Sequence, residues 1–305
     1  MSGFASARGD ANAGIVNRLN SATASNAANY LTMPTPDGLG QMVHPDVWDF
    51  GTAWNGWRYW LAITPYSNTD ATTENPCILV SNDKTTWSIP SGGSNPIDPA
   101  PGGGRYNSDA DLWYEGGTLY CFWRSTGGND RIHYRTSTDG VTWSAATTIL
   151  DVAHNACISP AWYKIGATYY MIHIDATGAP NNTINVRTCS TLTGTYSSPT
   201  VAGTTPYLTT GDQFWHLNVC QDSDTLYMIL TSVNYQLYLA SSVNKGYFWT
   251  IPPSPILPKL PGTWQANIYR SCILRTATGF DLWYSAHNGG SPATWRTGYT
   301  TVVMP

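Results

Sequence analysis

The sequence predicts an all-β protein, a single five-bladed β-propeller with three to four antiparallel strands in each blade. Three observations predict this fold. One pattern of short strands recurs five times at spacings of about 50 to 60 residues, which is the size of a propeller blade. Each repeat alternates Tyr, Trp, Ile and Leu with polar residues over short runs that end at Gly, Asn or Asp, as antiparallel strands do. No long stretch has the periodicity of a helix.

The repeats divide the chain into an arm and five blades. Residues 1–40 are rich in Ala, Asn, Ser and Thr. We expect them to form an extended or partly helical N-terminal arm that acts as a tether, and it would either pack on a neighbouring subunit or close the propeller as an extended strip. The propeller itself would span residues 41–305. The predicted blades are about 41–97, 98–152, 153–206, 207–258 and 259–305.

The first two blades end in similar motifs, SNDKTTW at residues 81–87 and STDGVTW at residues 137–143. Asp and Gly in these motifs favour a turn between outer strands. The Trp that follows is expected to pack between neighbouring blades. These motifs therefore indicate blades and carry no functional information of their own.

Composition and charge exclude several classes of function. Charged residues make up 11% of the chain and the net charge is −4, so no basic stripe is available for a nucleic-acid backbone. We find no run of about 18 apolar residues and no signal-peptide pattern, and we expect no membrane insertion.

The six Cys lie in strand-like apolar runs and are expected to be mostly free, buried thiols. Nucleotide-binding motifs are absent, and we expect no cofactor.

The inner strands of a propeller converge on its axis, so the residues that begin them are candidates for a ligand site. These positions are polar in this chain, and buried polar groups need partners or a polar ligand. The six His show neither HxH nor HExxH spacing, so the local sequence indicates no metal site. The residues expected to bind a ligand are His44, Asp46, Asn107, Asp109, Ser159, His216, Asn218, Tyr269 and Arg270.

Aromatic residues are abundant, at 13% of the chain, and blade packing explains most of them. A smaller group lies at strand ends or in loops among Asn, Gly and Thr. Flat aromatic faces beside amides and hydroxyls suit sugar rings, although they also suit other protein contacts, and we favour carbohydrate as the ligand. This group comprises Trp48, Trp54, Trp57, Tyr66, Trp215, Tyr235, Tyr247, Trp264 and Tyr269.

Two sets of motifs resemble known families. The five-blade plan, with HPDV, SDADLWY and the two turn motifs, resembles the arabinanase and xylosidase class of glycoside hydrolases, the family 43-type propellers. The run from HPDVWDF to GGGRYNSDADLWY resembles more closely a propeller domain of phage tail-tip and baseplate receptor-binding proteins. This second resemblance covers about the first 145 residues well, and the rest by blade plan alone.

The second resemblance implies the main functional hypothesis. It implies a non-catalytic module of a phage virion, at the tail tip, fibre or a related external structure, that recognises host-surface carbohydrate. Its partners would be a cell-wall glycan or teichoic-acid sugar, and other virion proteins through the N-terminal arm. A purely structural virion decoration or adaptor protein is a further alternative.

The first resemblance implies a glycoside hydrolase that acts on a surface polysaccharide. Asp46 matches the base of that class, and Glu74, Asp109 and Asp111 are the remaining candidates for the carboxylate pair. Ser159 and His216 stand where the resemblance places the other two carboxylates of the class. The sequence therefore leans against an enzyme.

Overall fold

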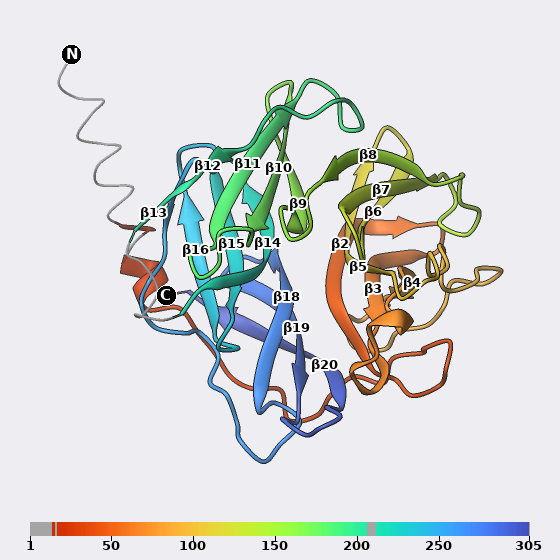
Figure 1. Ribbon diagram of the computed structural model, residues 1–305. Coiled ribbons are helices and arrows are strands. Elements are labelled where there is room, and N and C mark those ends of the chain that lie inside the picture. The colour runs from red at the N-terminus through yellow and green to blue at the C-terminus, as the bar shows by residue number, and fades with distance from the viewer. Residues whose placement is uncertain (1–13, 16, 206–211, 305) are drawn as a thin grey trace.

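A computed structural model describes residues 14–15, 17–205 and 212–304. Five sheets, with three to five strands each, surround a common axis and confirm the predicted five-bladed propeller. Their inner strands contact one another in a closed ring and face the middle of the molecule (Figure 1). These inner strands are β2 (Met42–Trp54), β5 (Tyr106–Glu115), β9 (Ile158–Ile165), β14 (Phe214–Asp222) and β18 (Asn267–Arg275).

Each inner strand pairs antiparallel with a second strand, which pairs in turn with a third. The second strands are β3 (Trp57–Pro65), β6 (Thr118–Thr126), β10 (Thr168–Asp175), β15 (Thr225–Ser232) and β19 (Gly279–His287). The third strands are β4 (Cys77–Ser81), β7 (Asp130–Ser137), β11 (Thr183–Cys189), β16 (Leu237–Ser242) and β20 (Trp295–Val303). Short outer strands complete four of the blades, namely β8 (Thr147–Val152), β12 (Thr200–Val201), β17 (Phe248–Thr250) with the parallel β13 (Gly203–Thr205), and β1 (Thr23–Ala24).

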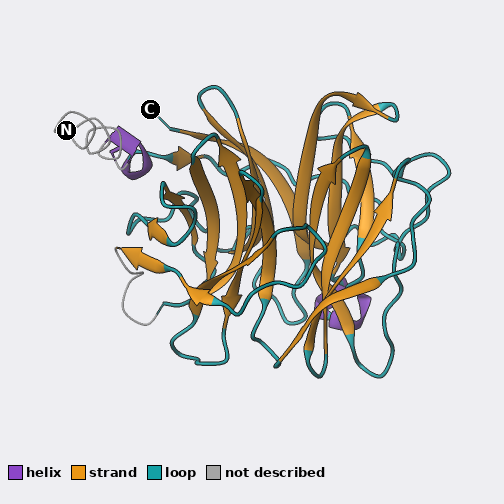
Figure 2. Cartoon of the chain, turned by 90° about the horizontal axis from the view of Figure 1, so that it is seen from above, coloured by secondary structure: helices purple, strands orange, loops and turns teal. Residues whose placement is uncertain are grey.

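The described part of the N-terminal arm packs on the propeller. Strand β1 pairs with β20, and Leu19 is buried against Phe280 and Val302 of blade five. The short helical segment before β1 lies at the same edge of the molecule as the end of β20 (Figure 2). These contacts agree with the extended strip that closes the propeller. The domain boundary at residue 40 and the tether role stay predictions, and residues 1–13 lie outside the described residues.

Buried apolar clusters fill the spaces between blades. Trp87 packs with Trp283 of blade five, and Trp143 packs against the apolar cluster that contains Trp60 of blade one. The Trp of each turn motif therefore lies between blades, as predicted. All six Cys are free, and four of them are buried. No helix among the described residues is long and apolar enough to span a bilayer.

Gly140 in the second turn motif is required by both its backbone and its surroundings. Its φ is +75°, and a Cβ there would collide with the buried indole of Trp60. We expect Gly140→Ala to lower the free energy of unfolding by about 2 to 3 kcal/mol, because left-handed strain and overpacking add. Urea denaturation measures this loss.

The matched control is Gly116→Ala, since Gly116 has a φ of +59° and an added Cβ there would meet no heavy atom within 4 Å. This variant carries the backbone strain alone and should lose only about 1 kcal/mol. Equal losses in the two variants would show that Trp60 does not restrict Gly140.

Candidate functional site

All five inner strands carry a β-bulge near their start. Breaks in the register with the second strand mark each bulge. In three blades the bulged residue has a left-handed backbone, with φ values of 60° at His44, 55° at Asp109 and 49° at Ser159. Residues other than Gly rarely adopt this conformation, and bulges change the direction in which side chains point. The bulges bring these three side chains together at the axis with His216 of blade four.

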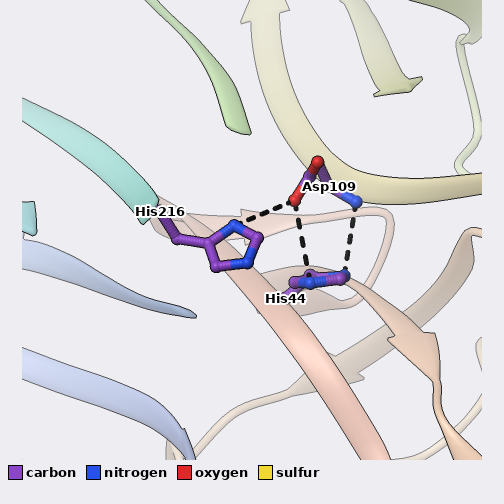
Figure 3. A group of neighbouring side chains, drawn as sticks. All are labelled: His44, Asp109 and His216. Atoms are coloured by element: carbon purple, nitrogen blue, oxygen red, sulfur yellow. Dashed lines mark hydrogen bonds and ion pairs between the residues drawn. The ribbon is translucent and has the colours of Figure 1, made fainter. Parts of the chain in front are cut away.

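His44, Asp109 and His216 form the centre of this buried cluster (Figure 3). One nitrogen or oxygen atom from each lies within 4.8 Å of the others. Asp109 Oδ1 is 3.3 Å from His216 Nδ1 and 3.7 Å from His44 Nε2. The backbone N–H of Asp109 donates to His44 Nδ1 at 3.3 Å. A single carboxylate oxygen therefore faces two imidazole rings.

Arg124 on β6 holds Asp109 in place from the other side. Its Nε lies 2.7 Å from Asp109 Oδ2, and its Nη1 lies 3.3 Å from Asp130 Oδ2. Burial by itself would raise the pKa of Asp109, but the Arg124 guanidinium and the two histidines hold that pKa well below its usual range. Asp109 is therefore ionised at neutral pH, and its Oδ1 is directed at the imidazole rings.

Glu74 approaches the cluster from blade one. It follows the short 3-10 helix η2 (Ala71–Thr73), and its Oε2 lies 3.4 Å from His44 Nδ1. Thr64 Oγ1 lies 3.0 Å from the same nitrogen. Burial raises the pKa of Glu74 well above its usual range, and the negative charge of Asp109 adds to this effect. The site thus holds one ionised carboxylate and one that favours the protonated form.

The cluster fits a divalent transition-metal ion. Three of its buried atoms have no hydrogen-bond partner, namely His44 Nε2, His216 Nε2 and Glu74 Oε2. Burial lowers the pKa of both histidines, so the rings are neutral, as metal binding requires. Two imidazoles and a carboxylate are a common donor set for such ions. The local spacing of His indicated no such site, because the candidate ligands come from three different blades.

Ser159, His216 and Asp109 do not form a nucleophilic triad. In a triad the serine and the aspartate contact opposite nitrogens of the histidine ring. Here Ser159 Oγ lies 2.5 Å from His216 Nδ1, and Asp109 Oδ1 lies 3.3 Å from the same nitrogen. The opposite nitrogen, Nε2, has no hydrogen-bond partner. This geometry favours binding of a ligand by the His216 ring over transfer of a proton from Ser159 Oγ to His216.

A cavity of about 550 Å³ opens next to this cluster. Tyr269 connects the two, because it lines the cavity while its ring centroid lies 4.4 Å from that of His216 and 5.5 Å from that of His44. Among the described residues that line the cavity, none carries a full charge. Four of the aromatic residues predicted to suit sugar rings are among them. The rings of the wall are Tyr66, Trp215, Tyr235, Tyr269, His287 and Trp295.

Asp46 lies away from the histidine cluster, farther along the axis. It accepts hydrogen bonds from the Leu112 backbone at 2.7 Å and from Asn218 Nδ2 at 2.8 Å. Asn218 also contacts Asp111 at 3.4 Å. These three side chains line a second cavity of about 240 Å³. The bulge after Val43 separates Asp46 from His44, so two residues of the HPD motif reach different parts of the axis.

Arg270 and Asn107 have structural contacts. The fully buried guanidinium of Arg270 donates to the Ala110 carbonyl at 2.8 Å and lies 3.8 Å from Asp111. It also donates to the carbonyls of Leu217 and His44, so it links blade five to the inner strands of three other blades. Asn107 donates to the Pro99 carbonyl at 3.1 Å and contacts Asn75 at 3.3 Å, which links blades one and two.

Sequence reasoning missed two residues of this region, Arg124 and His287. Arg124 follows the apolar run LYCFW in a middle strand. A lone arginine after so apolar a run signals a buried acidic partner, because buried charges are paired. His287 ends the last middle strand, SAHN, and carried no comparable signal.

Comparisons with known proteins point to carbohydrate-active enzymes. The chain is 39% identical over 116 residues to the A type blood N-acetyl-alpha-D-galactosamine deacetylase of Flavonifractor plautii, a match that covers 35% of this chain and 15% of that protein. The chain therefore matches only a small part of this relative's length. No family model matches the chain.

Solved structures share the fold. The crystal structure of an N-acetylgalactosamine deacetylase from F. plautii, in complex with blood group B trisaccharide, has a TM-score of 0.82 at 22% identity and covers 91% of this chain and 95% of that one. The catalytic domain of the Coprinopsis cinerea GH62 alpha-L-arabinofuranosidase has a TM-score of 0.64 at 12% identity, with 92% and 96% covered. The chain is thus a five-bladed propeller that resembles glycoside hydrolase propellers.

These findings correct the main functional hypothesis. The relative found by sequence and the structural neighbours described above are enzymes, so the interpretation as a non-catalytic phage virion protein was wrong. The lean against an enzyme is likewise unsupported. The enzyme alternative, a glycoside hydrolase that acts on a surface polysaccharide, agrees better with the findings. The motifs quoted for the phage resemblance belong to blades one and two. Motifs that build a blade indicate the fold and not the activity.

Proposed function

We propose that this protein is a metal-dependent hydrolase that removes the acetyl group from an N-acetylated amino sugar of a neutral glycan. The observation that carries the proposal is the cluster of His44, Asp109 and His216, whose two imidazole rings contact Tyr269 in the wall of an aromatic cavity. The activity named for the sequence relative, deacetylation of an N-acetylgalactosamine, supports it. The N-acetyl linkage is an amide, and amide hydrolysis is chemistry that such sites perform.

His44, Asp109 and His216 would hold the metal ion. When bound, the ion would lower the pKa of a water molecule and polarise the acetamido carbonyl group. Arg124 keeps Asp109 ionised and turned toward the rings, which is the orienting role of groups around a metal site. His44 Nδ1 accepts from the backbone N–H of Asp109 and also lies near Thr64 Oγ1 and Glu74 Oε2. A metal at Nε2 would require the ring proton to move to Nδ1, which would then donate to Thr64 or Glu74.

Glu74 is the candidate general base and acid. A cation at this place favours its ionised form, although burial alone favours the protonated one. Ionised Glu74 would take a proton from the attacking water as the new C–O bond forms at the carbonyl carbon. It would then deliver that proton to the amide nitrogen as the C–N bond breaks. The products are acetate and the free amino sugar.

Tyr269 is placed to contact the acetyl group. Its phenol lies 3.4 Å from Trp215 Nε1, and its ring lines the cavity and contacts both histidine rings. Burial raises the pKa of Tyr269 well above its usual range, so the hydroxyl keeps its proton. A protonated phenol at this position would donate to the carbonyl oxygen, where negative charge develops during attack.

The cavity supports an uncharged sugar as the substrate. Its described wall carries aromatic rings and no full charge. Aromatic faces stack on the apolar C–H faces of a pyranose, while a uronate or phosphate would find no cationic partner there. The substrate class is therefore a neutral N-acetylated glycan.

A second candidate function is glycoside hydrolysis at the same place. Glu74 and Asp109 are close neighbours whose pKa values are shifted in opposite directions. Such a pair can divide the roles of acid and base in a glycosidase. The structural neighbour of the GH62 class agrees with this candidate. The ion pair with Arg124 fixes the Asp109 carboxylate. A fixed carboxylate suits the role of metal ligand better than that of catalytic base.

Parallel product assays separate the two candidates. The purified protein is incubated with a 4-nitrophenyl N-acetyl-α-galactosaminide and with an N-acetylated glycan, and acetate and reducing ends are measured together. We expect acetate release without new reducing ends or free 4-nitrophenol. New reducing ends without acetate would select glycoside hydrolysis, and neither product with any N-acetylated substrate would contradict the proposal.

A further inference from the structure

His287 is the polar group in the aromatic wall of the 550 Å³ cavity that lacks a partner at one of its ring nitrogens. It ends β19 and is only 7% exposed. Its ring centroid lies 4.4 Å from that of Trp295 and 5.2 Å from that of Tyr235, at an interplanar angle of 78° to the tyrosine. Trp295 in turn contacts Tyr66 and Tyr269 at 5.0 Å. The imidazole is therefore fixed within a continuous set of packed rings.

The hydrogen bonds of His287 determine which nitrogen carries the proton. The backbone N–H of Gly289 donates to His287 Nδ1 at 3.1 Å. Nδ1 must then be unprotonated, because a protonated nitrogen cannot accept a hydrogen bond. The ring proton is consequently on Nε2, which makes this nitrogen a donor. Burial also lowers the pKa of His287 and so keeps the ring singly protonated.

This Nε2–H donor has no acceptor among the described residues. Leaving a buried donor unpaired costs about 1 to 3 kcal/mol. The two loops beside it are well defined by their own hydrogen bonds. Asn288 Oδ1 accepts from Gly290 N and Thr294 N, and Tyr235 holds a left-handed φ of 58° in its turn. The fold thus maintains an unpaired donor in the wall of a ligand cavity.

A ligand that satisfies this group must bring an acceptor oxygen and no positive charge. A hydroxyl of a pyranose fits this description, and the flanking rings of Tyr235 and Trp295 provide faces for its C–H groups. Sites that hydrogen-bond one hydroxyl reject analogues without it strongly, because the protein group is then left unpaired. The Nε2–H of His287 is therefore suited to recognise one particular hydroxyl of a sugar.

We infer that His287 is a specificity-determining residue, whose Nε2–H donates to one hydroxyl oxygen of the sugar that occupies the aromatic cavity. It acts by positioning the sugar, and it takes no part in the proton transfers at Glu74. The inference rests on the proposed function for the identity of the sugar, but it requires only that a sugar binds.

The test compares His287→Phe with the wild-type protein on a substrate series. Phe keeps an aromatic ring for stacking and removes the donor. The series consists of a 4-nitrophenyl N-acetyl-α-galactosaminide and its 3-deoxy, 4-deoxy and 6-deoxy analogues, with kcat/KM for acetate release as the readout. We expect the wild type to disfavour one deoxy analogue by about tenfold or more, and the variant to lose this discrimination and to be slower on the parent sugar by a similar factor.

Two controls separate a specificity contact from a general effect. His133→Phe makes the same change on β7, where the ring contacts Ser125 and Thr148 and is not part of the cavity wall, and it should retain the discrimination. His287→Gln restores an N–H donor and should recover part of the discrimination, including where the Phe variant folds poorly. Equal losses on all four sugars, or unchanged discrimination in both His287 variants, would overturn the inference.

Binding of the same sugars, followed by tryptophan fluorescence, distinguishes failure of the inference from failure of the proposed function. Selective binding that depends on His287 without acetate release would reject the deacetylase activity and keep the inference. Acetate release whose selectivity does not depend on His287 would support the deacetylase activity and overturn the inference. Absence of binding by the whole series would overturn the inference as well.

Discussion

Asp109→Asn is expected to abolish acetate release, with a loss of kcat/KM of about 10³-fold or more. The substitution removes the negative charge of a ligand candidate whose Oδ1 faces both histidines. It also leaves Arg124 with Asp130 as its remaining ion-pair partner in the cluster. Steady-state kinetics on the 4-nitrophenyl substrate measure the loss.

The variant must be shown to be folded, because breaking a buried ion pair can cost about 3 to 5 kcal/mol of stability. Near-UV circular dichroism and urea denaturation give this information. Asp151→Asn is the matched control, since Asp151 forms an exposed ion pair with Arg131 at 2.8 Å on the outer strand β8. A folded Asp109→Asn protein with normal activity would exclude Asp109 from the site.

Glu74→Gln is expected to lower kcat by about 10²- to 10⁴-fold, the usual range for a general base and acid. Gln keeps the size and polarity of Glu but cannot accept and return the proton. Metal affinity should change much less than in Asp109→Asn, because Glu74 lies on the Nδ1 side of His44. Single-turnover acetate release and metal titration of the same preparation separate the two effects.

Glu115→Gln provides the control, since Glu74 and Glu115 are the two glutamates of the chain. Glu115 ends β5, where it pairs with Lys164 and Tyr169 away from the cluster. Its replacement should leave kcat within about twofold of the wild-type value. If Glu74→Gln behaved in the same way, another group would have to transfer the proton.

The fold was predictable because its information is local and repeated. Each blade carries its own strand alternation, and turn motifs such as STDGVTW recur with the Trp that packs between blades. The meeting of His44, Asp109, Ser159 and His216 was also predictable, since inner strands of a propeller converge. The prediction of five repeated blades therefore identified the strands that surround the axis.

The chemistry of the site was not predictable in the same way. Strand alternation alone cannot reveal the bulges that separate His44 from Asp46, and these bulges place the two side chains in different parts of the axis. The ligand candidates for a metal are more than 50 residues apart in the chain, so no spacing rule could detect them. Arg124 and His287 acquire their roles from contacts across the fold. Motifs of blade one could report a resemblance in fold but not an activity.

The proposed divalent metal ion at His44, Asp109 and His216 can be removed from the purified protein with a chelator. Zn²⁺, Mn²⁺ or Co²⁺ is then titrated back, while bound metal and released acetate are measured together. We predict that chelation abolishes acetate release and that about one equivalent of metal per chain restores it, in the wild type but not in Asp109→Asn. Undiminished acetate release from metal-free protein would show that the reaction needs no metal ion at this site.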